Sequence, residues 1–311
     1  MREIGGYFEL ECGSRPLYYQ DGIYLNICRS ALRYLIRVLG IKRIHVPFYT
    51  CYVVNDAIRQ EGCEVVNYKL DSQLMPIKKF CKDDFIIYNN YFGLTGNKVN
   101  ELASLYPNLI VDNAQAFYSQ PNCRAAIYSP RKFFGLPDGG ILRGKDIPTI
   151  ELQQGTSYDV TSHLLKRHDY GAQAAYRDFC ANDEALEQYP LQSMSKLTMA
   201  LMGNIDYEGV RERRLQNFKY LNENLSTEFP ISMSSDDVPL IYPFYTESGA
   251  EIRMRLIDNG IFCARYWPNV LKDIESDSLE YNLTTNIVAI PIDQRYNKYD
   301  MDSIIEIIDS Y

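Results

Sequence analysis

The stretch "AAIYSPRKFFGLPDGG", residues 125–140, places a lysine between two short apolar runs. The run "AAIY" is typical of a buried strand, and "GGIL" at 139–142 is typical of the start of another, so Lys132 is predicted on the connection between them. Connections at strand ends are where binding and catalytic side chains are usually mounted. Taken alone, a lysine in a loop is most often a solvated surface residue, so the rest of the chain has to decide its role.

Patterns of helical and strand type alternate around this stretch. Apolar residues recur at helical spacing over 28–40 and 50–62, and each of these segments ends on a glycine. Short runs rich in Val, Ile and Tyr predict strands at 43–47, 63–70, 84–93, 107–117 and 125–129, with a helix at 97–106. Strands interleaved with helices predict an α/β fold of three layers around a mostly parallel sheet.

The pattern changes after residue 205. A long charged helix is predicted over 206–225, followed by short strands and helices at 239–245, 249–260, 286–292 and 300–311. We therefore expect two closely joined domains: a large domain over residues 1–205 and a smaller C-terminal α+β domain over residues 206–311.

Composition and charge exclude several classes of protein. The net charge of −8 argues against nucleic acid as the main partner, and the basic run "RERR" at 211–214 is interpreted as a solvated helix face. No apolar run approaches the roughly 18 residues of a membrane span, and residues 1–13 have no apolar core of signal-peptide length. We expect a cytoplasmic protein that does not bind membranes.

The eight cysteines show no C-x-x-C spacing, and the chain has only three histidines. This argues against a structural zinc site and predicts no metal. Free thiols in a reducing cytosol are the better interpretation.

Polar residues follow the predicted strands where a ligand would bind. In an open α/β sheet, ligands collect at the carboxyl ends of the strands, and the N-terminus of a helix attracts anions. The candidate residues at this edge are Arg29, Ser30, Asp112, Gln115, Ser129 and Lys132. Pyridoxal 5′-phosphate needs a lysine for its Schiff base, an acid beside its pyridine nitrogen and a phosphate cradle, so this set suits that cofactor.

Four motifs then resemble, in order, those of the DegT/StrS family of sugar aminotransferases: "CRSAL", "VPFYTCYVVNDAIRQEG", "VDNAQA" and "YSPRKFFGLPDGG". The resemblance runs from about residue 20 to 145, and more loosely through "RLQNFKYL" and "GIFCARYWP" to "IPIDQRY". It implies the fold of the fold-type-I pyridoxal phosphate enzymes, of which aspartate aminotransferase is the typical member.

The resemblance also implies a role for each candidate. Lys132 would bind the cofactor covalently and then move a proton during transamination, where related dehydratases carry a histidine. Asp112 would pair with the pyridinium nitrogen, and Gln115 would bond the phenolic oxygen of the ring. Ser129 would hold the phosphate together with the start of the first helix, which carries Arg29 and Ser30. A capping role for Asp112 and a surface role for Gln115 are the ordinary alternatives.

The chain departs from the family pattern in two places. The family carries an aromatic residue, stacked on the cofactor ring, at the position of Cys51 in this chain; the substitutes available are Tyr49, Tyr52, Tyr91 and Phe92. The segment between Ser129 and Lys132 is also shorter than in most members of the family. The loop that usually supplies an asparagine from the neighbouring subunit is not recognisable, although "YPLQSMSKL" lies near the expected position.

The resemblance implies transfer of an amino group from glutamate to a nucleotide-linked keto-sugar in polysaccharide or glycoconjugate biosynthesis. The alternatives are a fold-type-I aminotransferase for a non-sugar ketone, an inactive relative, and a nucleotide-binding module without covalent chemistry. No G-x-G-x-x-G or Walker motif supports the last of these.

The resemblance further implies a homodimer with sites at the subunit boundary. Residues 158–192 mix aromatic, apolar and charged side chains without a clean helical stripe, and are predicted to be a partner surface. The alternative for this segment is a lid over the site of its own chain.

Overall fold

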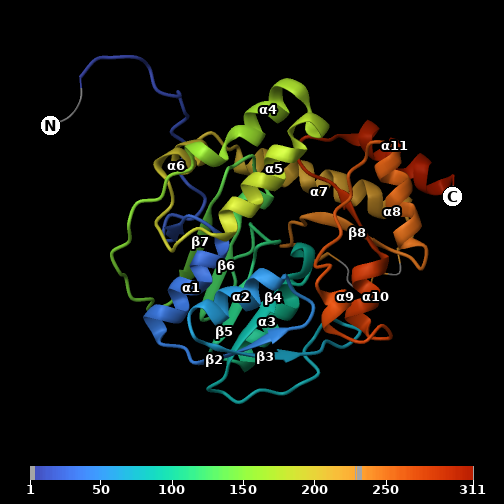
Figure 1. The fold of residues 1–311 in the computed structure, drawn as a ribbon. Helices are drawn as coiled ribbons and strands as arrows, with labels where there is room; N and C mark the ends of the chain where they lie inside the picture. Colours follow the sequence, from blue (N-terminus) through green and yellow to red (C-terminus); the bar gives the residue numbers. More distant parts are fainter. Residues whose placement is uncertain (1–3, 228, 230–232, 311) are drawn as a thin grey trace.

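A seven-stranded sheet forms the centre of the protein in a computed structural model, which describes residues 4–227, 229 and 233–310. The strand order is β1-β7-β6-β5-β4-β2-β3, and the strands from β6 to β3 are parallel (Figure 1). The strands are β1 (Ile23–Leu25), β2 (Arg43–Pro47), β3 (Glu64–Tyr68), β4 (Phe85–Asn89), β5 (Leu109–Asp112), β6 (Ala125–Tyr128) and β7 (Gly140–Gly144). The predicted mostly parallel α/β sheet is confirmed.

The strand β7 runs antiparallel to both of its neighbours, β6 and β1. The chain therefore turns back directly after β6, at the carboxyl end of the parallel strands, and Lys132 lies on that turn. The turn is the short 3₁₀ helix Pro130–Lys132. Lys132 is thus on the predicted connection between two strands.

Side chains that alternate along the strands build a separate core on each face of the sheet. On one face, Ile87, Ile110 and Ile127 pack with helices α1 (Cys28–Leu39) and α2 (Tyr52–Gln60). On the other face, the larger core also contains residues of α3 (Gly96–Leu105) and of the C-terminal part of the chain. The three predicted layers are therefore present.

The C-terminal part of the chain, residues 206–311, lies beside the second face of the sheet (Figure 1). Its antiparallel strands are β8 (Ile241–Tyr245) and β9 (Ile287–Pro291). Its helices are α7 (Tyr207–Asn224), α8 (Gly249–Asp258), α9 (Val270–Asp273), α10 (Leu279–Asn286) and α11 (Lys298–Asp309). The predicted α+β elements are all found here, while residues 1–3 and 311 of the two predicted domains lie outside the described residues, as do 228 and 230–232.

Three helices join the sheet to the C-terminal part, and the periodicity of the sequence did not predict them. Helices α4 (Ser162–Tyr170) and α5 (Ala172–Glu187) form a hairpin at the top of the view in Figure 1, and α6 (Lys196–Met202) follows. Helix α4 has no buried side chain, and α5 buries only Ala175, Asn182 and Leu186. A helix that buries so little has no clear apolar stripe in its sequence.

No helix in the described part of the chain is long and apolar enough to cross a membrane.

We predict that Gly140→Ala will lower the free energy of unfolding by about 2 kcal/mol or more. The added Cβ would collide with backbone atoms, and backbone atoms cannot move aside as the end of a flexible side chain can. A Cβ atom there would overlap the carbonyl of Ile27 and lie 2.6 Å from the nitrogen of Cys28. Urea unfolding followed by circular dichroism measures the loss. Gly135→Ala is the matched control, since a Cβ at that position meets no atom within 4 Å. Equal stability of the two variants would contradict the close approach.

Candidate active site

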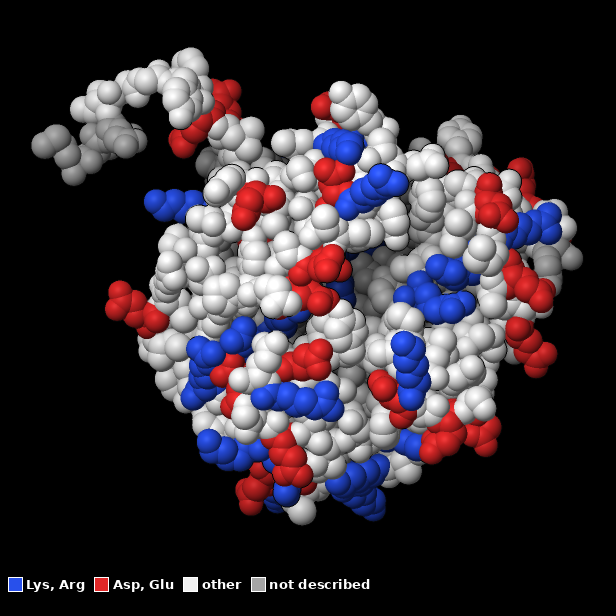
Figure 2. Space-filling view, in the orientation of Figure 1, with Lys and Arg blue, Asp and Glu red and all other residues white. Residues whose placement is uncertain are grey.

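A cavity of about 230 Å³ opens at the carboxyl ends of β5 and β6. The N-termini of α1 and α2 form its walls, and the last turns of α5 close it. Its lining residues are Ile27, Cys28, Arg29, Leu32, Cys51, Tyr52, Val53, Val54, Asp112, Ala114, Ile127, Ser129, Arg131, Lys132, Asp183 and Glu187. In the face shown by Figure 2, acidic side chains over α5 border a hollow in the surface.

Lys132 extends from a turn whose far end is held by a buried polar cluster. Asp138 is fully buried and accepts hydrogen bonds from the hydroxyl groups of Ser157, at 2.6 Å, and Thr198. Burial raises the pKa of Asp138, and the two hydroxyl hydrogen bonds oppose that rise. The loop that carries Lys132 is therefore anchored to α6 and to residue 157.

Asp112 ends β5 and faces the same cavity as Lys132. Its Oδ1 atom accepts a hydrogen bond of 2.8 Å from the Ala114 N–H. Burial raises the pKa of the carboxyl group, and the positive charge of Lys132 opposes the rise. A group bound in this cavity that presents a positive charge to Asp112 would stabilise the ionised carboxylate.

Ser129 and Arg29 lie on the part of the cavity formed by the start of α1. The N–H groups of Cys28 and Arg29 begin this twelve-residue helix and have no partner within it, while the Ser30 N–H donates to the Ile27 carbonyl at 3.1 Å. The helix N-terminus is therefore attractive to an anion. Ser30 lies in the same turn but is fully buried, and its Oγ atom is without a hydrogen-bond partner in the described structure.

The structure thus brings together four of the six predicted residues: Arg29, Asp112, Ser129 and Lys132. Ser30 and Gln115 are not among the lining residues. The Oε1 atom of Gln115 accepts a hydrogen bond of 3.0 Å from the Phe92 N–H, while its buried Nε2 donor is left without a partner. A buried donor of this kind is costly until an acceptor reaches it.

Two thiols and one phenol also line the cavity. Cys28 and Cys51 both line the cavity, and burial raises the pKa of both thiols. Tyr52 lines the cavity beside them and donates a hydrogen bond to Glu187.

The other aromatic candidates for contact with a ring lie elsewhere. Tyr49 and Tyr91 are buried against each other with ring centroids 5.3 Å apart, and Phe92 packs against Trp267. Tyr52 is therefore the one aromatic residue among the four that faces the cavity.

Three charged residues of the site were not predicted from the sequence. Asp183 and Glu187 reach the cavity from the end of α5, and Asp183 forms an ion pair of 2.5 Å with Arg131, the neighbour of Lys132. Glu187 binds Tyr52 across the mouth. The sequence pointed to these residues only through one alternative, in which residues 158–192 form a lid over the site of their own chain. Helix α5, within that segment, does cover the cavity.

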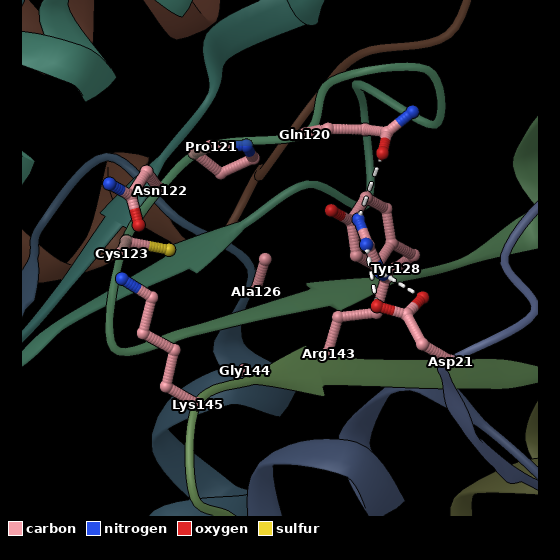
Figure 3. Close-up of a pocket in the computed structure, with 10 residues that line it drawn as sticks. All are labelled: Asp21, Gln120, Pro121, Asn122, Cys123, Ala126, Tyr128, Arg143, Gly144 and Lys145. Carbon is pink, nitrogen blue, oxygen red and sulfur yellow. Dashed lines mark hydrogen bonds and ion pairs between the residues drawn. The ribbon is translucent and has the colours of Figure 1, made fainter.

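A second cavity, of about 310 Å³, lies at the opposite edge of the sheet, where β6 begins and β7 ends (Figure 3). Arg143 is held there by two hydrogen bonds to Asp21, of 2.8 and 2.9 Å, and by one of 3.3 Å to Gln120. Lys145 lies at the other end of the cavity. The six predicted site residues are not part of its lining.

Comparison with known proteins identifies the fold. No family model and no curated protein matches the sequence. The structure is similar to the aminotransferase TlmJ from Streptoalloteichus hindustanus, with a TM-score of 0.64 and 16% identity over 93% of this chain and 85% of that one. The chain has the fold of these aminotransferases.

Two further structures agree with this result. The sugar aminotransferase CalS13 from Micromonospora echinospora has a TM-score of 0.62 at 14% identity and covers 93% of this chain and 87% of its own. Spr1654 from Streptococcus pneumoniae, in its PLP-form, has a TM-score of 0.61 at 15% identity, with coverage of 93% and 86%. The fold implied by the four sequence motifs is thereby confirmed.

We predict that Asp112→Asn will stabilise the cofactor-free protein at pH 7 and leave its stability unchanged near pH 3. Since burial raises the pKa of Asp112 above its usual 3.8, the folded chain holds this proton more tightly than the unfolded chain. The free energy of unfolding therefore falls as the pH rises from 3.8 through the raised pKa. Asparagine keeps the acceptor for Ala114 and removes the ionisation.

Urea unfolding at a series of pH values measures this difference. Asp258→Asn, at an exposed position, is the control for the removal of one carboxylate. An Asp112→Asn variant that is less stable than its parent at pH 7 would contradict the raised pKa of Asp112.

Proposed function

We propose that the protein is a pyridoxal 5′-phosphate-dependent aminotransferase of the DegT/StrS type. The observation that carries the proposal is the convergence of Lys132, Asp112 and Ser129 with the N-terminus of α1 on one cavity, in an aminotransferase fold. Of the alternatives, a nucleotide-binding module without covalent chemistry does not account for a lysine and a buried acid that face the same space.

The residues present fit this cofactor. Its aldehyde would meet Lys132, its pyridine nitrogen Asp112, and its phosphate the start of α1 with Ser129 and Arg29. Gln115 and Ser30 do not line the cavity, but each is the chain neighbour of a lining residue, and the Nε2 atom of Gln115 and the Oγ atom of Ser30 are buried without a hydrogen-bond partner in the described structure. We assign both to the support of the bound cofactor.

When bound, the cofactor supplies an electron sink for the carbon that loses its proton. The ionised carboxylate of Asp112, half-buried at the end of β5, would hold a proton on the ring nitrogen by a charge-assisted hydrogen bond. The Nζ atom of Lys132 carries the proton between the carbon atoms that exchange it. Tyr52 packs over the cavity in the role that an aromatic residue at position 51 fills in the family, and α5 excludes water from the mouth.

For the substrate, we propose a keto-sugar attached to a nucleotide, with glutamate as amino donor, in the synthesis of a polysaccharide or glycoconjugate. Support comes from the similarity in fold to CalS13, a sugar aminotransferase. A non-sugar ketone is the alternative. An activity screen across nucleotide-linked keto-sugars and 2-oxo acids separates the two. We further propose a cytoplasmic protein with a large domain over 1–205 and a small domain over 206–311.

We also propose a homodimer that joins its sites at the subunit boundary. The α4–α5 hairpin supports this, because Leu165, Tyr170, Tyr176 and Phe179 are each at least 43% exposed. Apolar side chains gathered on one exposed hairpin are typical of a protein interface. The hairpin is also next to the cavity, so a second copy bound there would lie close to the site.

We predict that Lys132→Ala will keep the fold and lose both the visible absorbance of the bound cofactor and turnover. No other lysine lines this cavity, so none can replace the amine. In the parent protein, borohydride should bleach the colour and fix the mass of the cofactor on Lys132, read by peptide mass spectrometry. Lys145→Ala, at the opposite edge of the sheet, is the control and should behave as the parent. Full turnover by Lys132→Ala would reject the mechanism.

We predict that light scattering at micromolar concentration will report a dimer, and that Phe179→Ser will weaken it by about tenfold or more, since interface aromatics commonly dominate binding. Ile77→Ser is the control, because Ile77 is also an exposed apolar residue but lies outside the α4–α5 hairpin. A diluted monomer that keeps full transaminase activity would exclude a shared site.

A further inference from the structure

A buried arginine without a carboxylate partner lies behind the turn that carries Lys132. Arg214, on α7, is 1% exposed and donates its hydrogen bonds to backbone carbonyls alone, among the described residues. The interpretation of the basic run 211–214 as a solvated helix face is therefore wrong for its last residue, because this position of α7 faces the core. The charge of Asp293 favours the ionised form of Arg214, but Asp293 forms its own ion pair with Arg295 at 2.7 Å. Burial lowers the pKa of Arg214 to about 10, which shows how unfavourable the position is for a cation.

The carbonyls that Arg214 binds belong to separate parts of the chain. One Nη atom donates to Leu240 at 2.9 Å, and the other donates to Phe133 at 3.4 Å. The guanidinium also lies 4.5 Å from the centroid of the Phe133 ring. Arg214 therefore bridges the loop before β8 and the residue directly after Lys132.

A second donor reaches the same carbonyl. The Nε2 atom of Gln294, in the segment after β9, donates to the Phe133 oxygen at 2.8 Å. A carbonyl oxygen has two lone pairs, so two donors saturate it. Both donors belong to the C-terminal part, 81 and 161 residues away from Phe133 in the chain.

We propose that Arg214 and Gln294 are positioning residues for Lys132: by holding the Phe133 carbonyl, they fix the turn from which the amine enters the cavity and couple that turn to the C-terminal part. This inference rests on the proposed function for the role of Lys132. An apolar side chain would fill the site of Arg214 at lower cost in stability, and only a long side chain with two separated donors spans both carbonyls. The Asp138 cluster holds the other end of the same loop, so the turn is fixed from both sides.

The test uses Arg214→Met and Gln294→Met, with Asn217→Leu as the matched control. Asn217 is also buried on α7, and its side chain donates to the carbonyls of Ile292 and Tyr296, each at 3.1 Å. It therefore ties α7 to the segment that contains Gln294 without a contact to Phe133. A loss of general stability should appear in all three variants.

The first measurement needs no cofactor. Acetylation of Lys132 by acetic anhydride, relative to Lys145 in the same protein, is followed by mass spectrometry. Loss of one hydrogen bond of ordinary strength to the Phe133 carbonyl should loosen the turn. We expect Lys132 to be acetylated about fivefold faster, relative to Lys145, than in the parent protein. Asn217→Leu removes no hydrogen bond to the Phe133 carbonyl, so it should leave the relative rate unchanged within about twofold.

The second measurement uses the loaded enzyme. We expect kcat to fall by about fivefold at unchanged KM for the amino donor in Arg214→Met and Gln294→Met, since the group that moves the proton is displaced while the binding surface is kept. If Arg214→Met does not fold, Gln294→Met alone decides the question.

The positioning role would be overturned if Lys132, relative to Lys145, is acetylated at the parent rate in the methionine variants that fold. It would also be overturned if Asn217→Leu changes this relative rate as much as they do. Failure of the proposed function would show differently, as a parent protein that gains no visible absorbance with pyridoxal 5′-phosphate.

Discussion

The close approach of β7 to the chain before α1 is the constraint on which the site depends. Gly139 donates a hydrogen bond of 2.6 Å to the carbonyl of Asn26, and Gly140 leaves no room for a side chain against Ile27. This contact sets where α1 begins relative to the turn after β6. The N-terminus of α1 and Lys132 therefore face one cavity, although about a hundred residues separate them.

The cavity combines charges of both signs, and its electrostatics follow from how they are paired. Arg131 is neutralised by Asp183, while Asp112 is half-buried, with Lys132 as the nearby positive charge. The acids of α5 lie at the mouth and Asp112 lies beneath it. A ligand with an anionic end at α1 and a cationic ring atom at Asp112 would complement this arrangement, and the cofactor of aminotransferases has that polarity.

The C-terminal part contributes more than a second layer. Its core is continuous with that of the sheet, and α7 and the segment after β9 both reach the turn of Lys132. On the opposite side of the mouth, α4 buries no side chain and α5 buries few, and α5 is joined to the cavity by polar contacts. The site is thus held firmly from below and more loosely from above, which suits a cavity that must admit a substrate.

The sequence by itself determined the succession of most strands and helices along the chain, because a repeat of two or 3.6 residues reports which face of each element is buried. The order of the strands in the sheet, and the short edge strand β1, came only from the tertiary structure. The sequence also placed Asp112, Ser129 and Lys132 at one edge, since the carboxyl ends of neighbouring parallel strands meet there. The tertiary structure alone decided that Tyr52 faces the cavity while Tyr49 does not, and that Asp183 and Glu187 enter it. These choices depend on contacts such as Tyr52 with Glu187, 135 residues apart, and local periodicity carries no information about pairs so distant.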